Sequence, residues 1–93
     1  MEKIQSLRKR IDEVDERILG LLGERVKLCR AIGTVKKEHG IPVKDSLREE
    51  GVYTRIREKA AKLGLSPFQV EAVYREIIVV CTGVQESDKE RRN

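Results

Sequence analysis

Arg25 is the residue whose position points most clearly to chemistry, because it is a cation in an otherwise apolar helical seam. The seam steps alternately by three and four residues, which keeps its side chains on one face of a helix. Its apolar members are Ile4, Leu7, Ile11, Val14, Ile18, Leu21, Leu28, Ile32 and Val35. A guanidinium stays charged in proteins, and burying it without a partner costs roughly several kcal/mol. Either a carboxylate side chain or an anionic ligand must therefore meet Arg25.

Lys36 and Arg8 are the cations that could complete a site with Arg25. Lys36 follows Arg25 by eleven residues, which places both on one helical face, roughly 16 Å apart along the axis. Both side chains could lean toward a small anion between them. Arg8 precedes Arg25 by seventeen residues, so it lies roughly 25 Å away and about 100° around the axis. Arg8 could serve the equivalent site of an antiparallel partner chain, or it could be a solvated surface residue.

The other polar candidates have simple structural interpretations when each is taken alone. Gln85 lies four residues after Cys81 at the end of an apolar stripe and is most simply a helix-end residue. Glu49 forms a predicted capping box with Ser46, and Arg48 is expected in solvent. The sequence contains no glycine-rich phosphate loop, no Cys/His cluster and no nucleophile with an evident base. It therefore predicts neither a metal site nor a cofactor.

The seam predicts a first helix over about residues 3–39, ended by a glycine cap at Gly40 and by Pro42. At roughly 1.5 Å per residue this helix is more than 50 Å long. Gly20 and Gly23 raise the alternative of a break, and we favour continuity. Because helical stability comes mainly from tertiary contact, the far end of so long a helix predicts a partner chain.

Two shorter helices are expected to follow. The second is predicted to begin at Asp45 or Ser46 and to end before Gly64. The third has the clearest start, with Ser66 as N-cap and Pro67 at the first helical position. The 93 residues include 39% charged and only 3% aromatic side chains, a composition that favours helices over a β-sandwich. We therefore predict an all-α protein.

Bulk properties restrict the function only weakly. The net charge is +4, but sixteen acidic residues are interleaved with twenty basic ones, so no single-signed face predicts nucleic-acid binding. Cys29 and Cys81 lie far apart without metal-ligand spacing and are expected to be reduced thiols. No apolar run approaches the roughly 20 residues of a membrane span, and no secretory segment is evident. A cytoplasmic protein without membrane contact is expected.

The arrangement resembles the all-helical class of chorismate mutases from Leu7 to Gln85. The first matching segments are Leu7-Arg8-Lys9-Arg10-Ile11-Asp12 with Asp15, Leu21-Leu22-Gly23-Glu24-Arg25, and Gly33-Thr34-Val35-Lys36. The later ones are Pro42-Val43-Lys44-Asp45-Ser46-Leu47-Arg48-Glu49, Ile77-Ile78 and Gln85. The resemblance implies an interlocked homodimer of three-helix chains. The helical domain is expected to cover residues 1–86, and residues 87–93, which include no apolar side chain, are expected to fray or to form a disordered polar tail.

The same resemblance implies a site for chorismate that uses no cofactor and is shared between two chains. Arg25, Lys36 and Arg48 would bind the substrate carboxylates together with Arg8 of the partner subunit. Cys81 stands where a hydroxyl residue is common in the family, so a hydrogen bond to a carboxylate is weakened or missing there.

The resemblance also implies catalytic roles for Arg25, Lys36 and Gln85 in the rearrangement of chorismate to prephenate. Lys36 and Gln85 would hydrogen-bond the ether oxygen, while Glu49 would accept from the ring hydroxyl with Asp45 close to it. The main alternative is a non-catalytic helical dimerisation module in which Arg25 forms a buried salt bridge.

Overall fold

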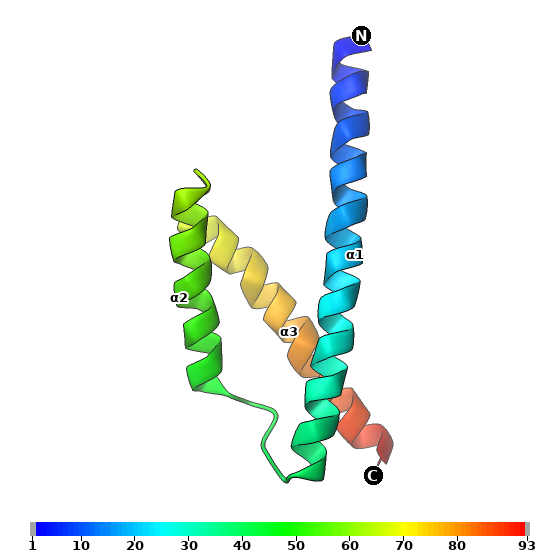
Figure 1. Cartoon of the computed structure of the whole chain (residues 1–93), viewed down its shortest axis with the longest axis vertical. Coiled ribbons are helices and arrows are strands. Elements are labelled where there is room, and N and C mark those ends of the chain that lie inside the picture. The colour runs from blue at the N-terminus through cyan, green and yellow to red at the C-terminus, as the bar shows by residue number, and fades with distance from the viewer. Residues whose placement is uncertain (1, 93) are drawn as a thin grey trace.

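The computed structural model describes the backbone of residues 2–92 and the side chains of residues 3–87. Its elements are α1 (Glu2–Glu38), α2 (Ser46–Lys62) and α3 (Pro67–Arg92), and the described residues contain no strand. Figure 1 shows α3 running diagonally from the end of α2 to the lower half of α1. Helix α3 packs on both other helices, whereas α1 and α2 do not contact each other in the described chain. The all-α prediction is confirmed.

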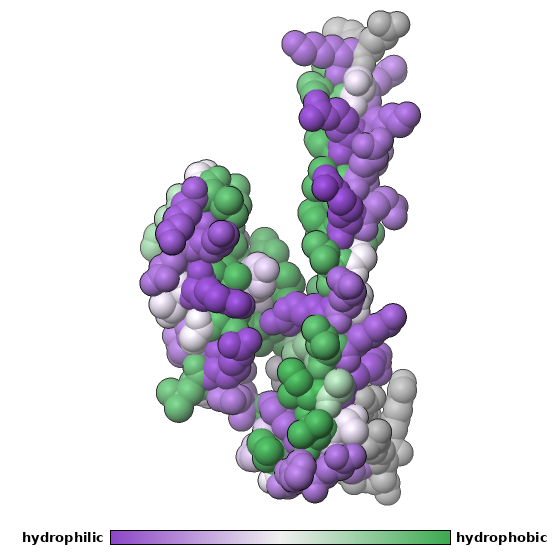
Figure 2. Space-filling view, in the orientation of Figure 1, coloured by the Kyte–Doolittle hydropathy of each residue, from purple (hydrophilic) through white to green (hydrophobic). Residues whose placement is uncertain are grey.

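Helix α1 is unbroken through Gly20 and Gly23, so the continuous interpretation is confirmed. Its upper half has no neighbouring helix, and seam residues such as Ile11 (58% exposed) and Leu21 (64% exposed) face solvent. Figure 2 shows a stripe of hydrophobic surface along the side of α1 that faces α2. One chain therefore leaves most of the predicted seam uncovered.

Glycine ends α1 as predicted. Gly40 has a φ of +65°, a conformation that glycine adopts without the steric cost of a Cβ. The Ile41 N–H donates to the Lys36 carbonyl at 2.8 Å, and the Gly40 N–H donates to the Lys37 carbonyl at 3.3 Å. These two bonds form a Schellman motif, which satisfies the last carbonyls of α1 and turns the chain toward α2.

The capping box predicted at Ser46 and Glu49 is wrong. Asp45 is the N-cap of α2, and its side chain accepts from the Arg48 N–H at 3.0 Å. Ser46 is already helical. Glu49 accepts a hydrogen bond from Lys44 Nζ at 3.0 Å instead of accepting one from the backbone N–H of the N-cap residue. Two adjacent residues could both have capped this helix, and the one with the non-helical backbone does so.

The start of α3 is as predicted, because Ser66 Oγ accepts from the Gln69 N–H at 3.3 Å and Pro67 is the first helical residue. The core lies between α2 and α3, where Val52, Tyr53 and Ile78 are buried. Helix α3 continues to Arg92, through residues for which the sequence predicts fraying. Side chains beyond residue 87 lie outside the described ones, so the assignment of residues 87–93 as a disordered tail stays a prediction.

Cys29 and Cys81 form a disulfide that joins α1 to α3, so the expectation of reduced thiols is wrong. Their Cα atoms are 5.4 Å apart although 52 positions separate them in the sequence. This pairing depends on how α1 crosses α3, which spacing along one chain does not reveal. None of the helices in the described part of the chain combines the length and the hydrophobicity of a membrane-spanning segment.

Candidate functional site

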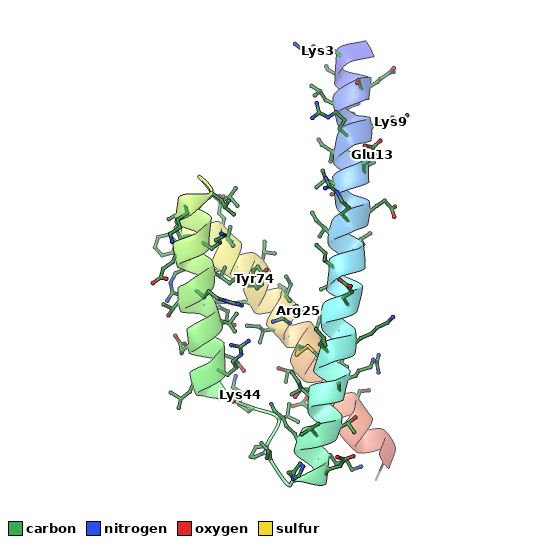
Figure 3. All side chains as sticks on the ribbon, in the orientation of Figure 1. Lys3, Lys9, Glu13, Arg25, Lys44 and Tyr74 are labelled. Carbon is green, nitrogen blue, oxygen red and sulfur yellow. A yellow bond between two sulfur atoms is a disulfide. The ribbon has the colours of Figure 1, made fainter. Side chains whose placement is uncertain are left out.

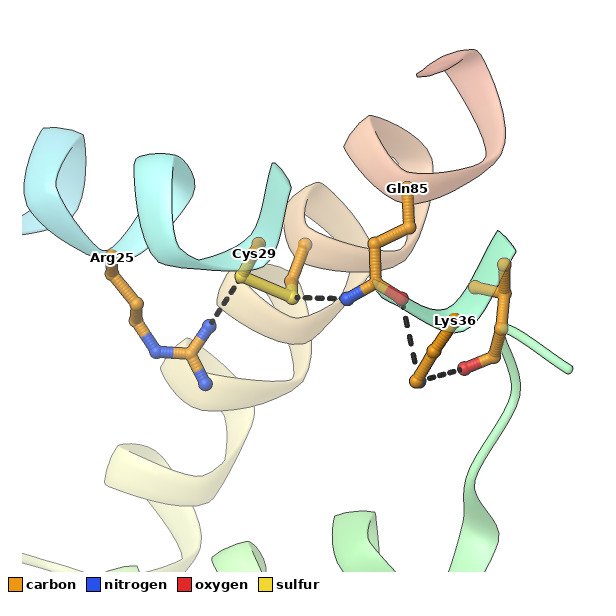
Figure 4. The surroundings of a disulfide bond; sticks show 6 residues. Arg25, Cys29, Lys36 and Gln85 are labelled. Carbon is orange, nitrogen blue, oxygen red and sulfur yellow. Dashed lines mark hydrogen bonds between the residues drawn. A yellow bond between two sulfur atoms is a disulfide. The ribbon is translucent and has the colours of Figure 1, made fainter. Parts of the chain in front are cut away.

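Lys36 and Gln85 meet where the lower half of α1 crosses α3. Lys36 Nζ donates to the Val43 carbonyl at 2.7 Å and to Gln85 Oε1 at 3.4 Å (Figure 4). Gln85 is only 5% exposed, so it is a buried residue of the crossing and not simply a helix-end residue. The fold thus brings together an ammonium group and a neutral amide that are 49 positions apart in the sequence.

Gly33 makes the close approach of Gln85 possible. A Cβ atom added at Gly33 would lie 2.9 Å from Gln85 Cγ and 3.2 Å from Gln85 Cα. The second of these atoms belongs to the backbone, so the helices themselves would have to separate to relieve the contact. Sequence reasoning assigned Gly33 no role of its own, although a glycine inside a predicted helix that also contains Lys36 was a signal for close packing.

The Cys29–Cys81 bridge lies one helical turn before the contact between Gly33 and Gln85. Gln85 Nε2 donates to Cys81 Sγ at 3.4 Å, while its oxygen accepts from Lys36. A disulfide sulfur carries no hydrogen, so in this state Cys81 accepts hydrogen bonds and cannot donate one to a ligand. This agrees in direction with the expectation that a hydrogen bond from Cys81 to a substrate carboxylate is weakened or missing, and the place of Cys81 in a substrate site stays a prediction.

Arg25 lies on the other side of the bridge. Its Nη1 contacts Cys29 Sγ at 3.8 Å, and the residue is half-buried. Figure 3 shows the Arg25 side chain leaving α1 on the side where α2 and α3 lie. No carboxylate among the described side chains pairs with it. The alternative of a salt bridge within one chain thus has no support here, and the guanidinium remains available to an anion.

The predicted site residues of α2 lie apart from Arg25, Lys36 and Gln85. Asp45 is engaged as the N-cap, and Glu49 is held by Lys44. Arg48 is exposed, and no hydrogen bond of its side chain is found within the described chain. Because α1 and α2 do not contact each other, the structure does not bring these three residues together with Lys36 and Gln85.

The predicted site residues line two separate pockets. One, of about 420 Å³, is lined by Lys36 and Gln85 together with the loop that follows α1. The other, of about 500 Å³, lies between α2 and α3 and includes Glu49 and Tyr53. Arg25 lines neither pocket, and Arg8 stands on the exposed upper half of α1. One chain therefore presents an open set of cations and not an enclosed cavity.

The chemistry available at this crossing is binding and hydrogen bonding. An ammonium group, an amide and a guanidinium can hold carboxylates and stabilise negative charge on an oxygen atom. The residues with described side chains contain no group of three His, Cys, Asp or Glu side chains placed to hold a metal ion.

Comparison with known proteins places the chain in a family. Residues 7–86 match the family of chorismate mutase type II. A bifunctional chorismate mutase/prephenate dehydratase of Aquifex aeolicus is 37% identical over 92 residues, which are 96% of this chain and 25% of that protein. A chorismate mutase of Methanocaldococcus jannaschii is 37% identical over 76 residues, 75% of this chain and 77% of that protein.

A solved structure agrees with these matches. A conserved hypothetical protein from Pyrococcus furiosus superposes with a TM-score of 0.72 at 30% identity, over 91% of this chain and 97% of that one. This chain thus spans a quarter of the Aquifex protein but most of the Methanocaldococcus and Pyrococcus chains. The chain belongs to the chorismate mutase type II family, the all-helical class of these isomerases.

Proposed function

We propose that this chain rearranges chorismate to prephenate, a step toward phenylalanine and tyrosine, at the crossing of α1 and α3. The contact between Lys36 and Gln85 carries the proposal, because it places the half-buried ammonium group of Lys36 beside the buried amide of Gln85, and both are hydrogen-bond donors. The half-buried Arg25 extends the cationic row on the same helix. The reaction is a pericyclic rearrangement of a dianion, so it requires neither a nucleophile nor a metal.

Lys36 and Gln85 would donate to the ether oxygen as the C–O bond breaks and negative charge develops there. An ammonium group has three N–H bonds, and Lys36 uses two of them, for Val43 and Gln85. The Gln85 amide has two N–H bonds, and one of them contacts Cys81. Each side chain therefore retains a donor for the ligand without breaking the contacts that hold it.

Arg25 and Lys36 would bind the substrate carboxylates and hold the dianion in its compact, reactive conformer. Arg48 from α2 would join them. Glu49 would accept a hydrogen bond from the ring hydroxyl, with Asp45 nearby. To do so, Glu49 must give up its ion pair with Lys44, whose side chain is 67% exposed. An exposed ion pair of this kind contributes little stability, so the exchange costs little.

The active unit would be a homodimer, with Arg8 of the partner subunit completing each site. The exposed apolar stripe of α1 supports this, because Ile11, Ile18 and Leu21 have no cover in one chain. The partial exposure of Arg25 supports a homodimer as well, since a second chain lying along α1 would cover Arg25 and Lys36. A cytoplasmic location stays a prediction.

The test is loss of chorismate absorbance with purified protein, together with a mass measurement of the assembly. Arg25→Ala and Lys36→Ala should each lower kcat/KM by at least about a hundredfold while the dimer remains folded. Lys27→Ala is the matched control, because Lys27 is an exposed cation on α1 two positions from Arg25. Loss of folding in the Arg25 and Lys36 variants would instead assign these residues a structural role.

The exposed apolar stripe of α1 also favours a second candidate, a helical dimerisation module without catalysis. A dimer that forms no prephenate from chorismate would support the module. Prephenate formation that disappears in Lys36→Ala, with the dimer retained, would exclude it.

A further inference from the structure

The Cys29–Cys81 bridge occupies the middle of the proposed site. Arg25, Cys29 and Gly33 follow one another at one-turn intervals on α1, and Cys81 and Gln85 do the same on α3. The bridge joins the helices at one turn, and the tight contact between Gly33 and Gln85 joins them at the next. Figure 4 shows the bridge between Arg25 on one side and the Gln85–Lys36 pair on the other.

Each sulfur atom of the bridge contacts one functional side chain. Cys29 Sγ lies 3.8 Å from Arg25 Nη1, and Cys81 Sγ lies 3.4 Å from Gln85 Nε2. Both contacts place the bridge sulfur as an acceptor. A thiol sulfur still accepts but also has an S–H bond that rotates and can donate, so reduction would give Cys81 a donor that can reach an acceptor such as Gln85 Oε1, whereas the all-donor guanidinium of Arg25 would still meet only an acceptor sulfur.

Reduction would also remove the covalent constraint between α1 and α3 at this turn. Without the bond, the two thiols are free to separate, either by side-chain rotation or by a shift of α1 against α3. The close contact of Gly33 with Gln85 leaves little slack at the next turn, so a shift of α1 against α3 would move Gln85 as well.

We propose that the Cys29–Cys81 bridge is a redox-controlled positioning element, which holds Arg25 and Gln85 at the separation that the dianionic substrate requires. This inference rests on the proposed function.

Cys81 is the more accessible cysteine, because Cys29 is only 4% exposed. A thiolate of a dithiol attacks Cys81 Sγ, the S–S bond breaks, and Cys29 leaves as a thiolate that takes up a proton. The second thiol of the reductant then resolves the mixed disulfide, leaving two protein thiols and an oxidised dithiol.

Arg25 makes this exchange chemically reasonable. Its guanidinium lies beside Cys29, the sulfur that leaves, and a nearby cation stabilises a thiolate. The same residue that would bind a substrate carboxylate would thus interact with the sulfur that controls its position. A bound dianion would compete with the leaving thiolate for Arg25, so substrate should slow reduction.

The test compares the intact dimer before and after treatment with dithiothreitol, with alkylation and mass measurement to count free thiols. KM for chorismate should rise about fivefold on reduction, at the low end of typical coupling between sites, with a smaller change in kcat. Reoxidation should restore KM. Chorismate should slow the appearance of alkylated Cys81. All measurements are made at a temperature at which circular dichroism shows that the oxidised and the reduced protein are both folded.

Cys29→Ala provides the variant control, because it removes the bridge and leaves Cys81 as a thiol. Its KM should equal that of the reduced protein and should not respond to dithiothreitol. A lower melting temperature with an unchanged KM on reduction would make the bridge a purely structural crosslink and overturn the inference, with the proposed function intact. Two free thiols in the untreated protein would overturn it as well. Absence of prephenate in both redox forms would overturn the proposed function, and the inference with it.

Discussion

Gly33 lies so close to Gln85 that a single added carbon at Gly33 would stand 2.9 Å from Gln85 Cγ. This contact places Gln85 Oε1 within reach of Lys36 Nζ, so the geometry of the proposed catalytic pair depends on a glycine that has no functional group. The same contact makes α1 and α3 sensitive to small changes in their separation.

Gly33→Ala should therefore damage activity more than folding. The added methyl group must push the α3 backbone away and carry Gln85 with it, which costs about 1–3 kcal/mol of stability and should lower kcat/KM by at least about tenfold. Activity and the free energy of unfolding from urea titration measure the two effects.

Gly51→Ala is the matched control, because nothing lies within 4 Å of a Cβ at that helical position. It should stabilise the protein by about 0.4–1 kcal/mol and leave activity unchanged. Equal effects of Gly33→Ala and Gly51→Ala would show that the tight crossing has no functional consequence.

Gln85→Glu should make activity depend on pH. A glutamate beside the Lys36 ammonium would be ionised at neutral pH, and its carboxylate would occupy Lys36 and repel the negative charge on the ether oxygen. We expect kcat/KM to fall about a hundredfold at neutral pH and to recover partly only as the pH falls below about 4, because the neighbouring ammonium group opposes protonation of the carboxylate. The wild type, with its neutral amide, should keep its activity through neutral pH.

Gln85→Ala distinguishes this explanation from simple loss of the amide. It removes the same contacts without adding a titrating group, so its activity should stay low at every pH. A wild-type rate that collapsed above about pH 6, well below the ordinary lysine pKa of about 10.4, would argue against the assignment of Gln85 to the ether oxygen.

The stability of the α2–α3 pair should depend on the charge of Glu71. Hydrogen bonds from Arg57 and from Arg75 hold the pKa of the Glu71 carboxyl below its ordinary value, and the Arg75 guanidinium also stacks 4.4 Å above the Tyr53 ring. Because the folded pKa lies below the unfolded one, the stabilisation is fully present above about pH 4–5 and is lost as the pH falls through the folded value.

Glu71→Gln should thus lower the melting temperature at neutral pH and change it little in strong acid. Thermal unfolding of both proteins as a function of pH measures this difference. Glu76→Gln is the control, since Glu76 is an exposed carboxylate on the same helix. A constant difference between Glu71→Gln and wild type at all pH values would contradict the role of the charge.

The helices and their ends were largely predictable because they depend on local signals. The Ser66 cap, Pro67 and the glycine end of α1 each act within a few residues. The start of α2 was predicted only as Asp45 or Ser46, because the two residues have similar capping propensity, and the backbone conformation decides between them.

The site was predictable only in part, because its contacts depend on how α3 crosses α1. The disulfide and the contact between Gly33 and Gln85 both follow from the register of that crossing. No spacing within one helix determines that register. The role of Arg8 depends on a further surface, the partner chain, and stays a prediction. The role of Arg48 stays a prediction as well, because α2 does not contact α1 in the described part of the chain.

Mixed dimers offer the sharpest test of a site shared between chains. Arg8→Ala and Arg25→Ala should each inactivate the pure dimer, because every site lacks one cation. In a dimer of one chain of each kind, one site contains Arg25 of its own chain and the intact Arg8 of the partner subunit, while the other site lacks both.

Random exchange of equal amounts should produce mixed dimers as half of the population, each with one working site, so about a quarter of the wild-type activity should return. Recovery should follow subunit exchange in time, as measured by mass spectrometry. Arg8→Ala mixed with Lys36→Ala should behave in the same way. By contrast, Arg25→Ala mixed with Lys36→Ala should recover nothing, because these two cations belong to one chain's half of the site. Recovery in that last pair would mean that Arg25 and Lys36 serve different sites. That result would contradict the proposal that both act at the same α1–α3 crossing.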